Sequence, residues 1–388
     1  MSNPFASGSP VQGDQFGDRE DEARWLVNRM TNGQNVFISS PRRFGKTSLL
    51  LRAIPEARAQ GARVGFANLF YCSERREVAE HITRAVVEGA LGWLEGTVEQ
   101  VRERIRGLPG VNPTLEHAGW KFGLALRGPE HTWLEEIRRP VELLAESAAD
   151  GRPVCLVIDE FQQVAELNLG LPGLFKAIAD DLPNISLVFA GSRRHVMQRL
   201  FVGAGAPLQN VADPLSLPVI PAGLMVPFLI ERCASQGREL REEAAAEIFE
   251  LVRGIPHFVQ LLAASAFDRE ENPITIDVAR LALVDTLKRQ RGELALRYEQ
   301  LATGQKRLLK ALAGQPATDL YAKPFLDRTG LAKSSVDRAK KSLEAAEHII
   351  YDDRLGWRVA DPIFERHLQF GELLDMGEEV DPDNIVSM

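Results

Sequence analysis

The first half of the chain alternates short apolar runs with longer amphipathic stretches. The apolar runs have the length of buried strands and lie at residues 36–38, 62–70, 153–158 and 185–190, with a further candidate at 120–126. Between them, apolar residues recur at helical spacing, at 19–30, 77–93 and 133–149. Continuous apolar strands that alternate with helices are typical of a parallel sheet covered on both faces. We therefore predict an α/β fold with a parallel sheet sandwiched by helices.

The strand signals fade after Pro221. Residues 223–291 have the spacing of helices, with breaks at 254–256 and 272–273, and predict an all-α region. Residues 300–370 are patterned separately. Three helical segments follow one another, with Ser334 or Ser335 as the expected cap of the third, and two short apolar strands come after them. This order predicts a winged-helix domain.

Composition narrows the class of protein. The chain has 388 residues, which favours two or three domains, and no apolar run approaches the ~20 residues of a membrane helix. The polar N-terminus is no secretory signal, and the three cysteines and seven histidines form neither a disulfide framework nor a metal-ligand spacing. We expect a cytoplasmic protein without a membrane partner. The net charge of −8 requires any nucleic-acid contact to be local.

A candidate phosphate-binding loop follows the first apolar strand. Gly45, Lys46 and Thr47 open an apolar helical segment directly after the loop. Backbone N–H groups at a helix N-terminus attract phosphate, a lysine reaches the outer phosphates, and a hydroxyl lies where Mg²⁺ binds. The alternative is an ordinary strand–turn–helix, and Ser40 stands where the complete pattern has glycine.

A second candidate element is the acidic pair that ends the apolar strand at 153–158. Hydrolysis of a nucleoside triphosphate needs a magnesium site and a group that orients water, so Asp159 and Glu160 are the candidate metal ligand and base. The alternative is a solvated strand end, where a following helix favours acids. Ser192 either senses the γ-phosphate or caps the next helix. Arg193, Arg194 and Arg199 are candidates for stabilising transition-state charge, or form a solvated helix face.

These elements together resemble the archaeal/bacterial ATPase branch of the STAND class of AAA+ P-loop ATPases. The resemblance is carried by Phe16-Gly-Asp-Arg-Glu20, Pro41-Arg-Arg-Phe-Gly-Lys-Thr-Ser48, Ile158-Asp-Glu-Phe-Gln162, Gly254-Ile-Pro-His-Phe258 and Trp357-Arg-Val-Ala-Asp-Pro-Ile-Phe364. It implies ATP and Mg²⁺ as cofactors, with Thr47 and Asp159 on the metal and Glu160 as the catalytic residue. The nucleotide-binding residues that it implies are Val11, Arg19, Ser40, Pro41, Arg42, Arg43, Phe44, Gly45, Lys46, Thr47, Ser48 and Pro256.

The resemblance also implies a domain order. The expected parts are an N-terminal arm near the nucleotide (1–15), a P-loop ATPase domain (16–220), a helical lid (221–295), a winged-helix domain (296–370) and an acidic tail (371–388). Three positions depart from the family pattern. Ser40 is expected to loosen the phosphate cradle, Asn68 stands where an aspartate is common, and residues 208–212 lack the arginine from which an arginine finger could be assigned.

Three functions remain open on the sequence. The first is an ATP-hydrolysing switch whose nucleotide state controls the winged-helix domain. The second is a nucleotide-gated DNA-binding regulator with little or no hydrolysis, although the third winged-helix segment carries only one net positive charge. The third is a sensor that docks a partner protein. Homo-oligomer formation is open in each case, and the preference for ATP over GTP depends on the resemblance.

Overall fold

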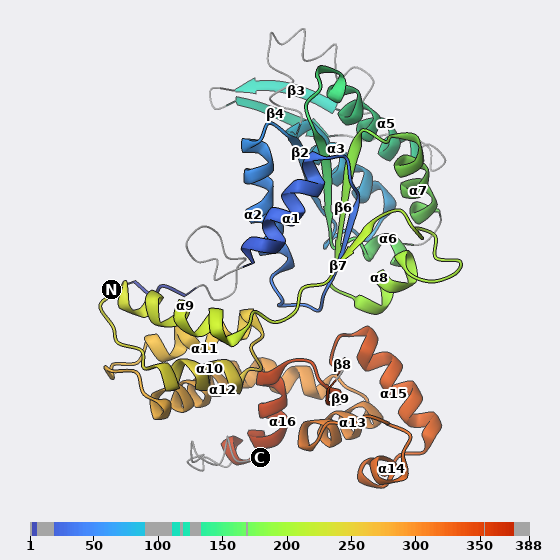
Figure 1. Cartoon of the computed structure of the whole chain (residues 1–388). Helices are drawn as coiled ribbons and strands as arrows, with labels where there is room; N and C mark the ends of the chain where they lie inside the picture. The colour runs from blue at the N-terminus through green and yellow to red at the C-terminus, as the bar shows by residue number, and fades with distance from the viewer. Residues whose placement is uncertain are drawn as a thin grey trace. The chain divides into compact units, whose positions relative to one another are not determined.

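The computed structural model describes residues 2–5, 19–89, 111–116, 119–124, 133–167, 170–352 and 354–375, without the side chains of 111–124, 133 and 372–375. The chain divides into two compact units (Figure 1). One is Arg19–Pro218, and the other combines Met1–Asp18 with Val219–Met388. Val11 and most of the predicted arm and tail lie outside the described residues, so what we predicted for them stays a prediction.

A five-stranded parallel sheet forms the centre of the unit Arg19–Pro218, with the strand order β2-β5-β6-β1-β7. The strands are β1 (Val36–Ser39), β2 (Arg63–Asn68), β5 (Val154–Asp159), β6 (Ile185–Gly191) and β7 (Asp213–Leu215). Every residue of β5 and β6 is buried. The continuous apolar runs of the sequence are therefore strands that are covered on both faces, as parallel sheets require.

Helices cover both faces of this sheet (Figure 1). On one face α1 (Glu20–Thr31) packs against α2 (Lys46–Ala59). The other face carries α3 (Arg75–Gly89), α5 (Trp133–Glu146), α6 (Gln163–Glu166), α7 (Leu171–Asp181) and α8 (Arg194–Phe201). Their apolar side chains form one buried core with alternate strand residues such as Leu156, Ile158 and Phe189. Because side chains alternate across a strand, the residues between these face α1 and α2.

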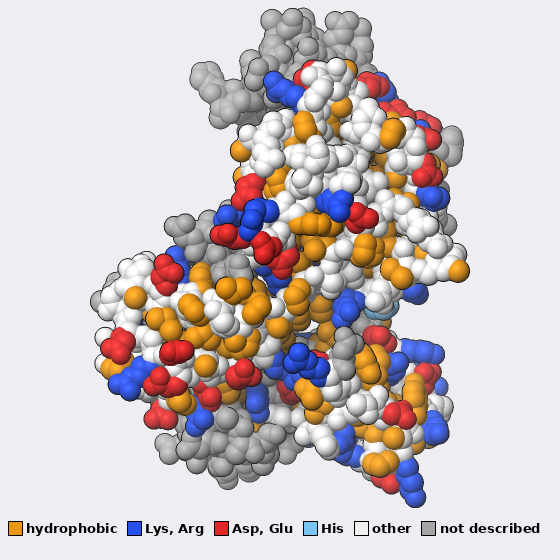
Figure 2. Space-filling model, viewed as in Figure 1, with side chains coloured by type: hydrophobic (Ala, Val, Ile, Leu, Met, Phe, Trp, Pro, Cys, Tyr) orange, Lys and Arg blue, Asp and Glu red, His pale blue; other side chains and the backbone are white. Residues whose placement is uncertain are grey.

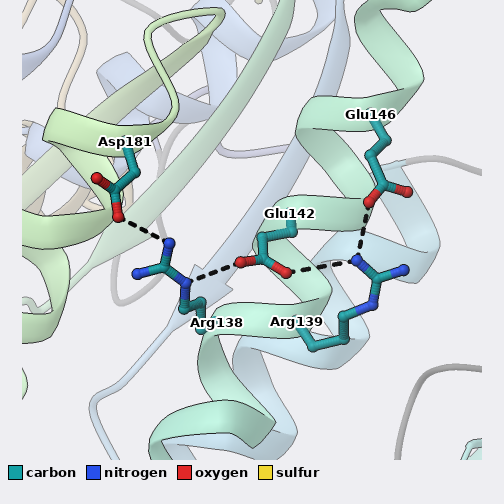
Figure 3. Close-up of polar contacts among 5 residues, drawn as sticks. All are labelled: Arg138, Arg139, Glu142, Glu146 and Asp181. Carbon is teal, nitrogen blue, oxygen red and sulfur yellow. Dashed lines mark hydrogen bonds and ion pairs between the residues drawn. The ribbon is translucent and has the colours of Figure 1, made fainter.

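Charged side chains on α5 link its turns and reach α7 (Figure 3). Arg138 contacts Glu142 at 2.8 Å and Asp181 at 2.7 Å, and Arg139 contacts Glu146 at 2.8 Å. Such pairs of partly exposed side chains at the surface contribute little to stability, on the order of 0.5 kcal/mol each. The opposite, buried face of α5 therefore determines its position.

A two-stranded antiparallel hairpin is separate from the parallel sheet. It consists of β3 (Val111–Glu116) and β4 (Gly119–Leu124). Residues 120–124 of the strand candidate at 120–126 thus form a strand, but it pairs within this hairpin, and the last two residues lie outside the described ranges. The 3-10 helix η3 (Ser147–Asp150) lies between α5 and β5.

The second unit contains helices α9 (Ala222–Ala234), α10 (Glu242–Leu251), α11 (Pro256–Phe267) and α12 (Ile276–Glu299). The breaks expected at 254–256 and 272–273 separate α10 from α11 and α11 from α12. The predicted boundary between residues 295 and 296 falls inside α12. None of the helices in the described ranges has the combined length and apolar character that crossing a bilayer demands.

The remaining elements of this unit are α13 (Thr303–Gly314), α14 (Lys323–Thr329), α15 (Lys333–Ala345), β8 (Ile349–Asp352), β9 (Gly356–Val359) and α16 (Pro362–Asp375). β8 and β9 pair antiparallel, with Ile349 opposite Val359. The capping prediction for Ser334 and Ser335 was wrong. The N-cap of α15 is Ala332, and both serines lie inside its first turn, because the helix begins earlier than we predicted.

The first described residues of the chain pack within the second unit. Asn3 Nδ2 donates to the Ala264 carbonyl at 3.0 Å and to Asp268 Oδ1 at 2.7 Å. The ring of Phe5 is buried and meets Phe267 edge-on, with ring centroids 6.2 Å apart. Residues 2–5 are therefore attached to α11 and the residue that follows it.

Candidate functional site

Polar residues meet at the carboxyl edge of the parallel sheet. Asn68, the last residue of β2, lies opposite Asp159, the last residue of β5. The end of β1 lies opposite Gly191 at the end of β6, so Ser40 and Ser192 follow paired strand ends. Ligands of open α/β sheets bind outside this edge, where the strand order reverses. The structure thus gathers the candidate residues that the sequence placed on separate strands.

The loop between β1 and α2 has the backbone of an anion cradle. Arg43 and Gly45 have φ values of 71° and 88°, in the left-handed region, and Gly45 is the N-cap residue of α2. First-turn N–H groups of a helix have no intrahelical acceptor, and the helix dipole favours negative charge there. The N-terminus of α2 can therefore receive a phosphate group.

Lys46 is buried, and its ammonium is bound by the loop itself. Nζ donates to the Ser40 carbonyl at 2.6 Å and to the Pro41 carbonyl at 2.8 Å. Ser40 is fully buried, and its hydroxyl accepts a hydrogen bond from the Leu217 N–H at 2.6 Å. The expected loosening by Ser40 is not what the structure shows, because this side chain ties the loop to the segment after β7.

Thr47 and Asp159 bring two oxygen ligands together. Thr47 Oγ1 donates to Asp159 Oδ2 at 2.9 Å, and Asn68 Nδ2 donates to the same oxygen at 3.3 Å. Burial raises the pKa of Asp159 to about 6, and the charge of Glu160 acts in the same direction. A hydroxyl and a carboxylate suit Mg²⁺, which takes few protein ligands and completes its shell with water and phosphate. In the ranges that are described, no cluster of three His, Cys, Asp or Glu residues could hold a metal.

Glu160 has a backbone conformation that is uncommon for its residue type. Its φ is 56°, in the left-handed region, which a side chain with a Cβ enters at a cost. Ser192 Oγ donates to Glu160 Oε2 at 3.2 Å, and the amide of Gln162 donates to the same oxygen. The capping alternative for Ser192 is not realised, because Arg193 is the N-cap residue of α8 and has no side-chain cap.

Two residues at this edge received no role in the sequence analysis. Gln162 is buried and contacts both Glu160 and Ser192, and Asn68 contacts Asp159. Gln162 ends the motif Ile158-Asp-Glu-Phe-Gln162, so its place in that motif was the available signal. Asn68 was noted only as a departure from the family pattern. The register of β2 against β5 shows that this residue still reaches the carboxylate.

Arg19 contacts the backbone on both sides of the candidate site. Its side chain is buried, with guanidinium N–H groups 3.1 Å from the Phe44 carbonyl and 2.6 Å from the Pro218 carbonyl. It also forms an ion pair with Glu22 at 3.1 Å. These contacts hold the phosphate loop in place, and a role for Arg19 beside a base stays a prediction.

The other predicted residues are more dispersed. Arg42 and Arg43 are exposed on the loop, and the Arg42 guanidinium lies 5.9 Å from the centre of the Phe70 ring. Arg193 pairs with Glu166. Exposed positions on α8 hold Arg194 and Arg199, and the first residue of α11, in the second unit, is Pro256. The structure therefore brings together Ser40, Lys46, Thr47, Asp159, Glu160 and Ser192.

Residues 295–370 match a family model described as a probable winged helix domain. No curated protein matches the chain. Among solved structures, a Walker-type ATPase of Pyrococcus abyssi has a TM-score of 0.64 at 17% identity, over 94% of this chain and 99% of that one. The ADP form of the ORC2 protein of Aeropyrum pernix has a TM-score of 0.49 at 13% identity, over 98% of this chain and 96% of that one.

The likeness to the Pyrococcus abyssi protein shows that this chain has the fold of a Walker-type ATPase. The predicted fold class is confirmed: a parallel sheet between helices is followed by a helical region and a C-terminal winged-helix domain. At this identity the likeness concerns the fold. Any conclusion about chemistry therefore depends on the residues of the site.

Proposed function

We propose that this protein binds ATP together with Mg²⁺, hydrolyses it, and uses the nucleotide state to control its winged-helix domain, as a switch of the STAND/AAA+ type. The observation that carries the proposal is the contact of Thr47 Oγ1 with Asp159 Oδ2 at 2.9 Å, beside the buried ammonium of Lys46. A cation, a hydroxyl and a carboxylate at a helix N-terminus are the set of groups that a magnesium-bound triphosphate requires.

Each residue has a role in this chemistry. The N-terminus of α2 and Lys46 bind the phosphates, and Thr47 with Asp159 would hold Mg²⁺, which supplies neutralisation of phosphate charge when bound. Glu160 orients the attacking water and accepts its proton. Ser192, hydrogen-bonded to Glu160, is positioned to respond to the terminal phosphate.

The nucleotide preference and the more distant contacts belong to the proposal as well. ATP is preferred over GTP by resemblance to the STAND-class ATPases, which also assigns base-side contacts to Val11 and Arg19 and a nucleotide contact to Pro256. Docking of a partner protein and homo-oligomer formation are compatible with such a switch.

The first test separates binding from the fold. Lys46→Ala removes a charge-assisted contact to phosphate, so we expect ATP affinity to fall about 100-fold. Titration of a fluorescent ATP analogue measures it, with Lys176→Ala on α7 as the control, because Lys176 is exposed and pairs with Asp180 on the same helix. Unchanged affinity in Lys46→Ala would refute the phosphate-loop assignment.

The second test addresses hydrolysis. Glu160→Gln keeps the shape of the side chain and removes its ability to accept a proton. We expect ATP turnover to fall by about 10² to 10⁴-fold, while ATP affinity stays close to wild type. Full turnover in Glu160→Gln contradicts the role of Glu160 as base and leaves the binding proposal intact.

A second candidate function, nucleotide-gated DNA binding, is favoured by the exposed charges of the winged-helix region. Within the described part of residues 295–370, eight Lys and Arg residues are exposed, against three acids. The basic residues are Arg307, Lys310, Lys323, Arg328, Lys333, Arg338, Lys341 and Arg354, and the acids are Glu299, Asp319 and Asp327. Figure 2 shows Lys and Arg side chains spread over this region. The local charge is thus opposite to the net charge of −8 of the whole chain.

Salt dependence tests this candidate. If Lys333 and Arg338 on α15 contact phosphate, duplex DNA affinity must fall steeply with salt, and Lys333→Ala with Arg338→Ala must reduce the log–log slope by about 2. Fluorescence anisotropy with and without ATP measures both. Absence of binding, or binding that ignores salt, leaves protein docking as the role of the domain.

A further inference from the structure

Gln162 connects the candidate base to the neighbouring strand end. The side chain is 1% exposed. Its Nε2 donates to Glu160 Oε2 and lies 3.4 Å from Ser192 Oγ, while its Oε1 accepts the Ser192 N–H at 3.2 Å. A neutral amide is the side chain that donates to a carboxylate and accepts from an N–H at the same time. The nitrogen and the oxygen of the Gln162 amide therefore both form hydrogen bonds.

The Gln162 amide packs closely against the end of β6. Gly191 lies at the end of β6, and a Cβ placed there would approach Gln162 Oε1 to 2.8 Å and Met197 more closely still. The absence of a side chain at Gly191 thus lets the amide reach Ser192. Contacts on both sides of the amide determine its orientation, and with it the orientation of Glu160.

We propose that Gln162 is a positioning residue for the hydrolysis assigned to Glu160. Gln162 and Ser192 both donate to Glu160 Oε2, which fixes the rotation of the carboxylate and directs its other oxygen to water. This inference rests on the proposed function. It predicts an effect on the chemical step, because Gln162 acts through its contacts with Glu160 and Ser192.

The test compares Gln162→Met with Gln163→Met. Gln163 is the next residue, and its amide donates to the Phe70 carbonyl at 3.3 Å, so it controls for a lost amide in the same turn. A misplaced catalytic group costs about 10²-fold, and we expect a kcat loss of this order in Gln162→Met. KM and the number of nucleotides bound per chain should stay at wild-type values, which a merely structural role would not predict.

The possible results separate the inference from the function on which it rests. Wild-type kcat in Gln162→Met, or a loss of kcat matched in Gln163→Met, overturns the role of Gln162 while Glu160→Gln remains inactive. A wild-type protein that binds ATP without turnover overturns the proposed hydrolysis and the positioning role together.

A second, independent observation concerns the turn between α10 and α11. Arg253 and Gly254 have φ values of 59° and 62°, and a Cβ at Gly254 would lie 2.3 Å from the Phe249 ring. The tight turn therefore needs glycine, and it leads directly into Pro256. From this turn the Arg253 guanidinium reaches the winged-helix region, donating to the carbonyls of Val359 at 2.9 Å and Ala360 at 3.2 Å.

Further charges strengthen this connection. Arg253 lies 3.6 Å from Glu365 of α16, and burial lowers the pKa of Arg253 to about 10, so the guanidinium remains charged at neutral pH. Arg297 of α12 pairs with Asp361 at 2.9 Å. Asp361 also accepts the N–H groups of the first turn of α16, so it caps that helix. Half-buried arginines from the helical region thus contact both the end of β9 and the start of α16.

We propose that Arg253 transmits movement of the turn carrying Pro256 to the winged-helix region. A rigid guanidinium fork bound to two carbonyls converts a displacement of the turn into a displacement of β9. This inference rests on the proposed response of Pro256 to nucleotide. It predicts that coupling is lost without Arg253 while nucleotide binding survives.

Hydrogen exchange on the full chain tests this link. Arg253→Met keeps the aliphatic stem, and Arg280→Met is the control, because the Arg280–Glu247 pair at 2.8 Å is similarly buried but joins α12 to α10. We expect the ATP-dependent change in exchange of residues 349–371 to fall at least about 5-fold in Arg253→Met only. ATP affinity should stay at wild-type values.

Hydrogen exchange measured without nucleotide tests the contact between Arg253 and β9 independently of ATP binding. Arg253→Met should accelerate exchange in the turn 252–255 and in β9 together, whereas Arg280→Met should not affect β9. Equal effects of the two variants on β9, or a full ATP response in Arg253→Met, overturn the role of Arg253. Failure of the wild-type protein to bind ATP overturns the proposed function and leaves this second measurement to decide the link.

Discussion

The carboxyl edge of the sheet and the junction around Arg253 are both clusters of buried charge, but they are balanced differently. At the edge of the sheet, burial raises the pKa of Asp159 to about 6, and the like charge of Glu160 adds to this effect. At the junction, burial lowers the pKa of Arg253 and raises that of Glu365, and in each case the opposite charge of the partner counteracts burial. For Asp159 the like charge of Glu160 outweighs the opposite charge of Lys46, whereas for Arg253 the opposite charge of Glu365 is the largest of the neighbouring charges.

This difference separates a site whose charge a bound ligand would compensate from a contact whose charge is compensated within the protein. Two adjacent carboxylates in a buried place cost stability, and folded proteins accept such a cost where a bound cation compensates it. The Arg253 guanidinium has two carbonyls and the Glu365 carboxylate as partners, so its charge is compensated within the protein, although its Nε has no acceptor among the described residues. The comparison therefore predicts opposite signs for neutralising substitutions in the two clusters.

The largest expected effect is at the junction. Arg253→Met leaves two carbonyls without their donor and removes the ion pair with Glu365, so we expect the free energy of unfolding to fall by about 3 kcal/mol. Exchange of the slowest amides of β9 and α16 in the full chain measures it. A loss no larger than that of Arg280→Met would contradict the special role of this arginine.

A neutral residue in place of Asp159 at the edge of the sheet should raise the free energy of unfolding, whereas Arg253→Met should lower it. Asp159→Asn removes a buried negative charge beside Glu160, so at pH 7 without Mg²⁺ we expect the free energy of unfolding to rise by about 1 to 2 kcal/mol. The same variant should lose the stabilisation that Mg²⁺ and ATP give to the wild type. Exchange of the slowest amides in β5 measures both, with exposed Asp180→Asn as control. A lower free energy of unfolding in Asp159→Asn would refute the inference that the charge of Asp159 destabilises the folded protein without Mg²⁺.

The pH dependence sharpens this prediction. Asp159 has a folded pKa of about 6 against an ordinary value of 3.8, so its protonated form favours the folded state. Its contribution is fully present at pH values below the ordinary value and is lost as pH rises through about 6. The stability gap between Asp159→Asn and wild type should therefore be near zero at pH 3.5 and complete at pH 7. A gap that is independent of pH would exclude this carboxylate as its origin.

The smallest effect is expected on the surface. Arg139 pairs with Glu142 and Glu146 on exposed turns of α5 (Figure 3). Because solvent screens such pairs, Arg139→Ala should change the free energy of unfolding by only about 0.3 kcal/mol. Exchange of the slowest amides of the sheet measures this change. A loss of unfolding free energy comparable to that of Arg253→Met would show that the difference in burial does not explain the different contributions of the Arg139 and Arg253 ion pairs.

Much of the fold was readable because its signals are local. Each of the buried strands β5 and β6, and the loop with Lys46 and Thr47, is formed by consecutive residues. The residue types within each segment therefore predict its structure. The same holds for Gly254 and Pro256, whose backbone preferences define a turn. The hairpin of β3 and β4 was not predicted although its strands are neighbours in the chain, because β3 contains Asn112 and Pro113 and lacks the apolar pattern of a strand.

The amino-acid sequence alone thus determined the order of strands and helices, the phosphate loop, and the identity of the acids at 159 and 160. Tertiary structure alone decided that Asn68 and Thr47 share one oxygen of Asp159, that Gln162 contacts both Glu160 and Ser192, and that Arg253 reaches β9. The physical reason is distance along the chain. Propensity and periodicity act over neighbouring residues, whereas these contacts depend on strand register, close packing and burial, which exist only once the chain has folded.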